Sequence, residues 1–287
     1  MKEIVLDAYG KINIGLDVTG RRDDGYHLVR MIMQTVDISD QVRVSAREGS
    51  GRISISCDNA AVPEGEGNIA FRAARLVMDR YGIMDDIFID IRKNIPMAAG
   101  MAGGSTDAAA VIRALDKLYD IDMPQGSADE IALKLGADVP FCLRRGTWLS
   151  EGIGEKLTRI DDMPDAHVLI VNPGFEVSTA GVYKALDAEK DPEHPDIDTL
   201  MAAIGSGSMT ITASYMGNIL ETVTEGDHPE IGMIKKKMLE YGAAGSMMTG
   251  SGPTVFGLFE REEDTYAAMQ YFKGHLYDKC FVTHFIY

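Results

Sequence analysis

A run of small residues in the first half of the chain has the composition of a loop that could hold a phosphate. The segment IPMAAGMAGGSTDAA spans residues 95–109, with three glycines followed by two hydroxyl side chains. The apolar periodicity after it predicts a helix, whose first free N–H groups and dipole favour an anion. Ser105 or Thr106 could donate a hydroxyl hydrogen bond or contact a metal ion. A tight turn closed by helix-capping residues explains the same composition equally well.

The segment differs from two common phosphate-binding motifs. It lacks the Gly-Lys-Ser/Thr triplet of a Walker A loop. It also does not stand where the dinucleotide-binding fingerprint stands, which is after the first strand of a βαβ unit and before an acidic ribose ligand. A phosphate loop here must therefore belong to another class.

Two charged residues outside this segment also stand where chemistry is possible. Lys11 lies in the strand-like run YGKINIGL, where a lysine is more often simply solvated. Asp138 lies in GADVPF, after a glycine that ends a helix and before Val139-Pro140, a pair whose pre-proline restriction fixes the local backbone. An aspartate in such a turn usually serves the turn alone. Neither residue by itself predicts catalysis.

Strand and helix signals alternate around these residues. Apolar alternation with a period of two predicts strands at residues 4–8, 42–44, 53–55 and 87–91. Helical spacing predicts helices over 68–82, closed by Gly82, over 108–119, and over 128–136, closed by Gly136. The pattern predicts an α+β protein.

A polar, proline-bearing turn at residues 161–165 predicts a boundary between two domains. The first domain would cover 1–160, to which the final strand near 280–287 could return, and the second would cover 161–287. The acidic stretch 187–199 is expected to be a solvated loop of the second domain. A second glycine-rich turn, MTGSGPTVF, precedes a helix and a last strand.

Composition excludes several classes of function. The 287 residues include 28 basic and 44 acidic side chains, a net charge of −16, which argues against a nucleic-acid or anionic-membrane binder. A small anion held locally by backbone amides remains compatible with this charge. The three cysteines, Cys57, Cys142 and Cys280, have no metal-ligand spacing and suggest a reducing compartment. With no signal-peptide or membrane-span pattern, a cytoplasmic protein is expected.

Four segments, taken in order, resemble the motifs of the GHMP kinases, which act on small molecules such as galactose, homoserine and mevalonate. They are AYGKINIGLDVTGRRDDGYH, IPMAAGMAGGSTDAA, GADVPF and MTGSGPTVF. Together with the segments EGIGEKL and NPGFEVSTAGVY, they are most similar to the branch of GHMP kinases that phosphorylates a cytidine-diphosphate alcohol in non-mevalonate isoprenoid biosynthesis. The resemblance implies a two-domain GHMP kinase fold. Its N-terminal domain would be of the ribosomal protein S5 domain 2-like type, and its C-terminal domain would be ferredoxin-like.

The resemblance also implies the chemistry: ATP, with Mg²⁺, phosphorylates the 2-hydroxyl of the alcohol. Asp138 would accept the hydroxyl proton, while Lys11 would keep that carboxylate ionised and stabilise charge on the transferring group. Ser105 is the implied metal ligand. The residues implied to bind ATP are Asn68, Pro96, Met97, Ala98, Ala99, Gly100, Met101, Ala102, Gly103, Gly104, Ser105 and Thr106, and we call residues 96–106 the phosphate loop.

A second set of residues is implied to bind the alcohol substrate. Tyr26 and His27 would hold the cytosine, and Tyr183 would stack on the opposite face of the base. Asn13 and Thr179 would complete the polar lining, and Asp138 would face the reacting hydroxyl. His27 and Tyr183 could also be ordinary half-buried core residues.

Two other functions stay open at this point. A GHMP kinase of the homoserine or mevalonate type would leave the cytosine residues idle. A non-catalytic GHMP-fold binding module should have lost Lys11, Asp138 or the loop hydroxyls, all of which are present. The expected partner is a small molecule, with no nucleic acid and no membrane, and the expected state is a monomer or weak homodimer.

The chain departs from the family pattern at four places. Tyr9-Gly10 stand where the family usually has Pro-Ala, Ala102 stands for Gly, and Thr106 and Thr249 stand for Ser. None of these changes removes a reactive group. If position 102 requires a positive φ, its Cβ would cost about 1 kcal/mol.

Overall fold

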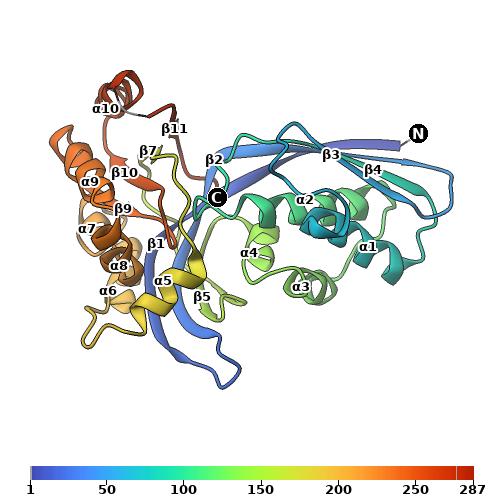
Figure 1. Ribbon diagram of the computed structural model, residues 1–287, viewed down its shortest axis with the longest axis horizontal. Helices are drawn as coiled ribbons and strands as arrows, with labels where there is room; N and C mark the ends of the chain where they lie inside the picture. Colours follow the sequence, from blue (N-terminus) through green and yellow to red (C-terminus); the bar gives the residue numbers. More distant parts are fainter. Residues whose placement is uncertain (1, 276) are drawn as a thin grey trace. The chain divides into compact units, whose positions relative to one another are not determined.

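The computed structural model describes residues 2–275 and 277–287, and the chain divides into two compact units (Figure 1). Unit 1 contains residues 2–10, Ile38–Ile95 and Ala102–Arg144; unit 2 contains Lys11–Asp37, Pro96–Met101 and the chain from Arg145 to Tyr287. Two long strands, β1 (Lys2–Arg21) and β2 (His27–Arg47), contribute residues to both units. The boundary between residues 160 and 161 stays a prediction.

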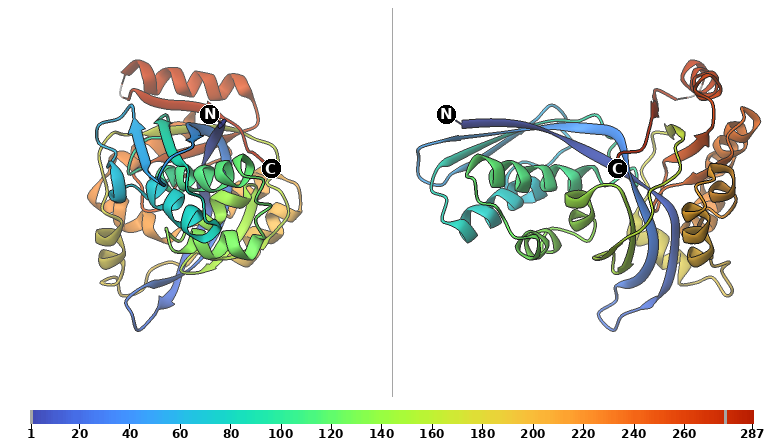
Figure 2. Two further views of the ribbon diagram at one scale, coloured as in Figure 1. Left: turned by 90° about the vertical axis from the view of Figure 1, so that its right-hand side faces the viewer. Right: turned by 180° about the vertical axis from the view of Figure 1, so that it is seen from behind.

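Unit 1 combines strands with a layer of helices. Strand β4 (Asp86–Arg92) pairs antiparallel with the end of β2 and parallel with β3 (Ile53–Cys57), which confirms the strands predicted there. Figures 1 and 2 show α1 (Ile69–Tyr81) and α2 (Gly103–Leu118) side by side along these strands. The remaining helices of this unit are η1 (Gly65–Gly67), α3 (Gln125–Leu133) and α4 (Val139–Arg144).

The core of unit 1 lies between the sheet and these two helices. Ile87, Ile89 and Ile91 of β4 are at most 1% exposed, because a period of two turns them all to the helix side. The buried faces of α1 and α2 are rich in alanine, which lets the two helices pack closely. This packing fixes the position of α2, whose first turn lies within the glycine-rich segment.

The helix predicted over residues 68–82 is confirmed, together with its end at Gly82. The Asn68 side chain accepts a hydrogen bond from the Ala70 amide at 2.8 Å, and Gly82 closes the helix in the left-handed conformation at φ 66°. The helix expected to end at Gly136 instead ends at Leu133. The chain from 134 to 136 continues as a hydrogen-bonded turn, in which the Gly136 amide donates to the Ala132 carbonyl at 3.2 Å.

Unit 2 contains two groups of strands. Strand β5 (Thr147–Gly152) pairs antiparallel with residues 29–34 of β2 and with β6 (Lys156–Arg159), and β8 (Gly217–Asn218) pairs parallel with β1. A separate antiparallel sheet has the order β11-β7-β10-β9. Its strands are β7 (His167–Asn172), β9 (Gly245–Met248), β10 (Val255–Phe259) and β11 (Lys279–Thr283).

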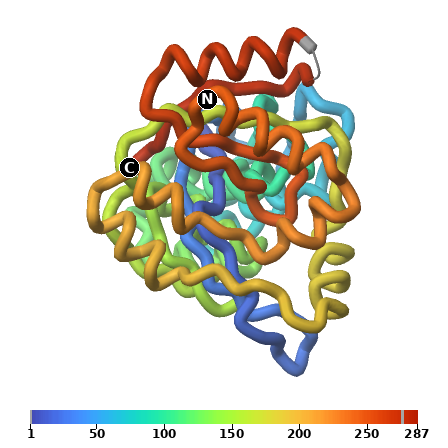
Figure 3. The backbone as a smooth tube through the Cα atoms, turned by 90° about the vertical axis from the view of Figure 1, so that its left-hand side faces the viewer, coloured from blue at the N-terminus to red at the C-terminus, as the bar shows by residue number. Residues whose placement is uncertain are grey.

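Helices cover this four-stranded sheet. Both α9 (Glu230–Glu240) and α10 (Glu262–His275) pack against it, and Figure 3 shows α10 alongside β11. The other helices of unit 2 are α5 (Thr179–Leu186), α6 (Ile197–Gly205), α7 (Met209–Ser214) and α8 (Ile219–Asp227). The mixture of helices and sheets confirms the α+β class. Within the described residues, no helix combines the length and the apolar character needed to cross a bilayer.

Candidate active site

Three of the sequence motifs meet inside unit 2. The Lys11 amide donates to the carbonyl of Met101 at 3.2 Å, which joins β1 to the phosphate loop. The Asn13 amide donates to Oγ1 of Thr249 at 3.0 Å, and that hydroxyl lies 3.4 Å from the carbonyl oxygen of Gly100. The strand motif, the first part of the loop and the second glycine turn therefore share one hydrogen-bonded cluster.

Two glycines allow this close approach. Gly100 has φ 72°, and a Cβ on it would lie 2.3 Å from the Thr249 carbonyl oxygen. Gly250 has φ 60°, and its Cβ would lie 3.3 Å from Gly100. The two glycine-rich turns thus touch backbone to backbone, so a side chain is excluded at Gly100 and would be strained at Gly250. Thr249, in place of the family's serine, still supplies the hydroxyl that joins them.

Lys11 and Asn13 form a buried polar pair. Nζ of Lys11 donates to Oδ1 of Asn13 at 2.6 Å, and the amide nitrogen of Asn13 lies 3.2 Å from Sδ of Met31. Lys11 is 5% exposed and Asn13 is fully buried. A lysine simply solvated on a strand would keep its ammonium group in water, so its burial here favours a specific role for the charge.

The aromatic residues predicted to hold cytosine lie partly together in unit 2. The rings of His27 and Tyr183 are 4.7 Å apart, centroid to centroid, at an angle of 31°. Because a base stacked between two rings needs about 7 Å, two van der Waals contacts, it does not fit between this pair. Tyr26 is 61% exposed, and Thr179 bonds to the Ser251 hydroxyl at 2.9 Å. The predicted clamp is therefore not preformed between His27 and Tyr183.

An acidic residue that the sequence did not single out orders this aromatic pair. Asp187 accepts from Nε2 of His27 at 2.8 Å and from Arg21 at 3.1 Å. The His27 hydrogen bond stabilises the charged carboxylate and lowers the pKa of Asp187. The acidic stretch 187–199 is largely exposed, as expected, but its carboxylates have specific partners, since Asp198 also pairs with Arg30 and Asp196 caps α6.

The second part of the phosphate loop lies in unit 1 and opens α2. The free N–H groups of the first turn of α2, beginning at Gly103, are the groups that favour an anion at a helix N-terminus. Ala102 precedes them at φ 59°, and Ala98 also has a positive φ of 49°. Position 102 therefore does adopt the left-handed conformation, at a cost of about 1 kcal/mol for alanine. Ser105 is half-buried and Thr106 is buried.

Asn68 and Asp138 occupy the starts of two helices of unit 1. Both polar atoms of the Asn68 side chain are engaged, with the Ala70 amide and with the Pro63 carbonyl at 3.0 Å. Asp138 directly precedes α4, and its carbonyl accepts from the Cys142 amide at 3.1 Å. Asp138 lies in a turn, as expected, but the pre-proline restriction does not hold Val139 outside a helix: Val139 begins α4, and Pro140 lies in its first turn, where no amide donor is needed.

Unit 1 contains a buried cluster of ionisable side chains that was not predicted from the sequence. Lys93, just after β4, donates to Oδ2 of Asp40 and, at 2.7 Å, to Oδ2 of Asp107. The side chains of all three residues are at most 5% exposed. Burial raises the pKa of Asp107 to about 8, although Lys93 acts to lower it. Burial opposes the charge of Lys93, but the two carboxylates outweigh it and raise the pKa of the ammonium.

A faint signal for this cluster exists in the sequence. Asp40 shares the strand parity of Ile38, Val42 and Val44, which are all buried. A carboxylate on the inward face of a strand requires a buried partner. The identity of that partner, 53 residues away, is not encoded in any local pattern.

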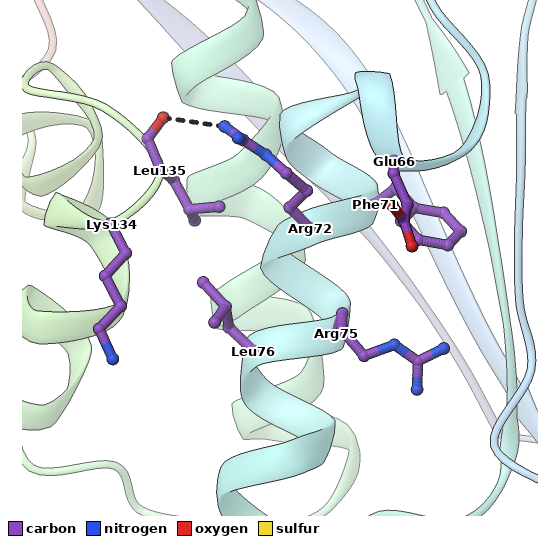
Figure 4. A pocket seen from close by; sticks show the side chains of 7 residues that line it. All are labelled: Glu66, Phe71, Arg72, Arg75, Leu76, Lys134 and Leu135. Atoms are coloured by element: carbon purple, nitrogen blue, oxygen red, sulfur yellow. Dashed lines mark hydrogen bonds between the residues drawn. The ribbon is translucent and has the colours of Figure 1, made fainter.

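A cavity of about 470 Å³ lies in unit 1, lined mainly by α1 and by the residues that follow α3 (Figure 4). Arg72 and Arg75 of α1 and Lys134 after α3 surround an apolar floor, and Arg72 donates to the Leu135 carbonyl at 3.3 Å. None of the predicted site residues lines it.

Throughout residues 2–275 and 277–287, no group of three or more His, Cys, Asp or Glu side chains is arranged to hold a metal ion.

The motifs and the fold correspond to known families. A family model for the GHMP kinases N terminal domain matches residues 68–146, and one for the GHMP kinases C terminal matches residues 193–278. The chain belongs to the GHMP kinases, which implies phosphoryl transfer from ATP, and the two-domain GHMP kinase fold is confirmed.

Individual relatives narrow the family further. The chain is 46% identical to the 4-diphosphocytidyl-2-C-methyl-D-erythritol kinase of Acetivibrio thermocellus, over 99% of both chains. It is 48% identical to the enzyme of that name from Clostridium botulinum, over 89% of this chain and 90% of the relative. It belongs to the 4-diphosphocytidyl-2-C-methyl-D-erythritol kinase family.

Solved structures agree with this placement. A crystal structure of 4-(cytidine 5'-diphospho)-2C-methyl-D-erythritol kinase superposes with a TM-score of 0.83, at 28% identity, covering 98% of this chain and 99% of that one. A homoserine kinase from Cytophaga hutchinsonii superposes with a TM-score of 0.75 at 20% identity, covering 96% of this chain and 90% of that one. The second likeness supports the fold alone.

Proposed function

We propose that the chain transfers the γ-phosphoryl group of ATP to the 2-hydroxyl of 4-diphosphocytidyl-2-C-methyl-D-erythritol, a step of non-mevalonate isoprenoid biosynthesis. The observation that carries the proposal is the cluster of unit 2, where hydrogen bonds join Lys11 to Met101, Asn13 to Thr249, and Thr249 to Gly100. Relatives that share almost the whole chain bear the name of this kinase, which supports the choice of substrate.

The residues divide the chemistry between them. Asp138 accepts the proton of the 2-hydroxyl as its oxygen attacks the γ-phosphorus, the bond from that phosphorus to the bridging oxygen breaks, and ADP leaves. Lys11 supplies positive charge to the transferring group, because its buried ammonium is held in place by Asn13. The loop amides and the first turn of α2 bind the ATP phosphates.

The roles of the remaining predicted residues follow the same pattern. Asn68 keeps α1 capped, so its part in adenine binding is to fix the backbone around it. Tyr26, His27 and Tyr183 bind the cytosine on their accessible faces, and Asn13 and Thr179 supply polar contacts. The base either stacks on the outer face of one of these two rings, or binds between the His27 and Tyr183 rings after they move apart.

The protein donors present suit Mg²⁺ only if the phosphates of ATP supply most of its ligands. The described residues offer no carboxylate cluster for it, and Mg²⁺ prefers oxygen ligands and retained waters. The hydroxyl of Ser105 would be its protein ligand, and the ion would neutralise charge on the β- and γ-phosphates. This assignment predicts weak metal binding without nucleotide.

Product analysis tests the proposed reaction. The chain is incubated with ATP, Mg²⁺ and the cytidylylated alcohol, and the product is examined by mass spectrometry and ³¹P NMR. The expected product carries one added phosphoryl group, on the 2-hydroxyl. A phosphate on another hydroxyl, or no transfer at all, would contradict the proposal.

A further inference from the structure

The buried cluster of unit 1 connects the residues that precede the phosphate loop with the residue that follows it. Oδ1 of Asp40 accepts from the amides of Asn94 at 2.6 Å and Ile95 at 2.8 Å, the last two residues before the loop. Its Oδ2 accepts from Lys93, which also donates to Asp107. Asp107 comes directly after Thr106, the last loop residue. One chain of hydrogen bonds therefore joins β2, the end of β4 and the second turn of α2.

We propose that Asp107, acting through Lys93 and Asp40, is a positioning residue that holds the two ends of the phosphate loop in the conformation that binds ATP. The proposal rests on the proposed function of residues 96–106 as the ATP-phosphate loop. Asp107 is not assigned to touch the nucleotide. Its effect passes through the separation and orientation of the loop ends.

Backbone conformation supports a need for such a constraint. The loop holds two alanines, Ala98 and Ala102, in the left-handed region. L-residues with a Cβ persist there only when the surrounding structure over-determines them. A hydrogen-bonded connection between the residues before and after the loop is a constraint of that kind.

The backbone at Gly103, where α2 begins, packs closely against the end of β4. A Cβ on Gly103 would lie 3.3 Å from Cγ2 of Ile95 and 3.4 Å from Nζ of Lys93. The first turn of α2 thus rests directly on the end of β4 and on the cluster. A change in the cluster would be passed to the amides that open α2.

Stability alone is a poor explanation for the cluster. Desolvation of buried charges offsets much of their mutual attraction, and apolar replacements of similar shape are often as stable. Oδ1 of Asp107 moreover has no hydrogen-bond partner among the residues that the structure describes. A polar group retained under these conditions is better explained by the geometry that it enforces.

Substitutions at Asp107 separate positioning from mere stability. Asp107→Asn keeps an oxygen that accepts from Lys93, whereas Asp107→Ala removes it and leaves Lys93 paired with Asp40, so the fold should survive. Val77→Ala, in the buried face of α1, is the control that destabilises unit 1 away from the loop. Asp107→Ser, with a hydroxyl too short to reach Lys93, is a second variant expected to behave as Asp107→Ala.

Two readouts test the proposal without phosphoryl transfer. Calorimetric titration with ADP should show affinity about tenfold weaker for Asp107→Ala, the loss of roughly one charge-assisted hydrogen bond, and within about twofold of wild type for Asp107→Asn and Val77→Ala. Amide hydrogen exchange over residues 94–104 should accelerate in Asp107→Ala and Asp107→Ser, but not in Asp107→Asn or Val77→Ala.

The proposal is overturned if Asp107→Ala binds ADP as the wild type does, or if Val77→Ala weakens ADP binding to the same extent. It is also overturned if Asp107→Asn behaves as Asp107→Ala, since the acceptor would then be irrelevant. Failure of the proposed function appears instead as a wild-type chain that does not phosphorylate the cytidylylated alcohol. The two failures are therefore distinguishable.

Discussion

Replacing Asp107 by asparagine should make the chain more stable than the wild type, by an amount that grows as the pH rises from mildly acidic to neutral. The native carboxyl keeps its proton to about pH 8, because burial raises its pKa. In the unfolded chain its pKa returns to about 3.9. Between these values the native state binds more protons than the unfolded state, so stability falls as pH rises.

The size of the effect follows from this difference in pKa. One proton contributes about 1.4 kcal/mol per pH unit, so raising the pH from about 5.5 to about 7 should cost the wild type about 2 kcal/mol through this carboxyl. For a chain of this size that corresponds to a change in Tm of about 4–8 °C. Asp107→Asn removes the titration while its amide oxygen still accepts from Lys93.

Thermal unfolding of wild type and variant at the two pH values measures this difference. Asp86→Asn is the control of opposite sign, because the Ser50 and Arg52 amides lower the pKa of Asp86. Its stabilisation is present at both pH values and is lost only as pH falls below about 4, so its Tm should differ from wild type by a constant amount. A Tm difference for Asp107→Asn that is also constant with pH would refute the reasoning.

Three further substitutions test the site. Asp138→Asn should lower kcat by about 10²–10⁴ with little change in the KM for ATP, because a positioned base is lost; an unchanged kcat would remove its assignment. Tyr183→Ala should raise the KM for the cytidylylated alcohol about tenfold and spare the KM for ATP, since stacking on the base is lost; equal increases in steady-state kinetics would argue against base stacking. Ala102→Gly should relieve about 1 kcal/mol of backbone strain and tighten ATP binding up to about fivefold in calorimetric titration; weaker binding would show that the loop requires alanine.

Local patterns predicted the elements that position the site. Asn68 and Gly82 bracket α1 because capping depends on neighbouring residues alone. The same holds for the strands, whose alternation is set by burial of one face. The family motifs then supplied the roles of Lys11, Asp138 and the glycine-rich loop, which spacing alone left undecided.

The interactions that order the site were harder to predict, because they join residues distant in sequence. Lys93 meets Asp40 across 53 residues, and His27 meets Asp187 across 160. Composition suggested a solvated acidic stretch around Asp187, since it reports average character and not individual partners. Likewise, the aromatic residue types predicted a cytosine clamp, but the contact between the His27 and Tyr183 rings depends on how α5 packs against β2 within unit 2.

The most direct test of the function is a coupled ADP-release assay with three alcohols at equal concentration: 4-diphosphocytidyl-2-C-methyl-D-erythritol, homoserine and mevalonate. We expect kcat/KM for the cytidylylated alcohol to be at least about 10³-fold higher than for the other two, because only that substrate uses the cytosine residues. Comparable turnover of homoserine or mevalonate, or ADP release that is independent of the alcohol, would contradict it.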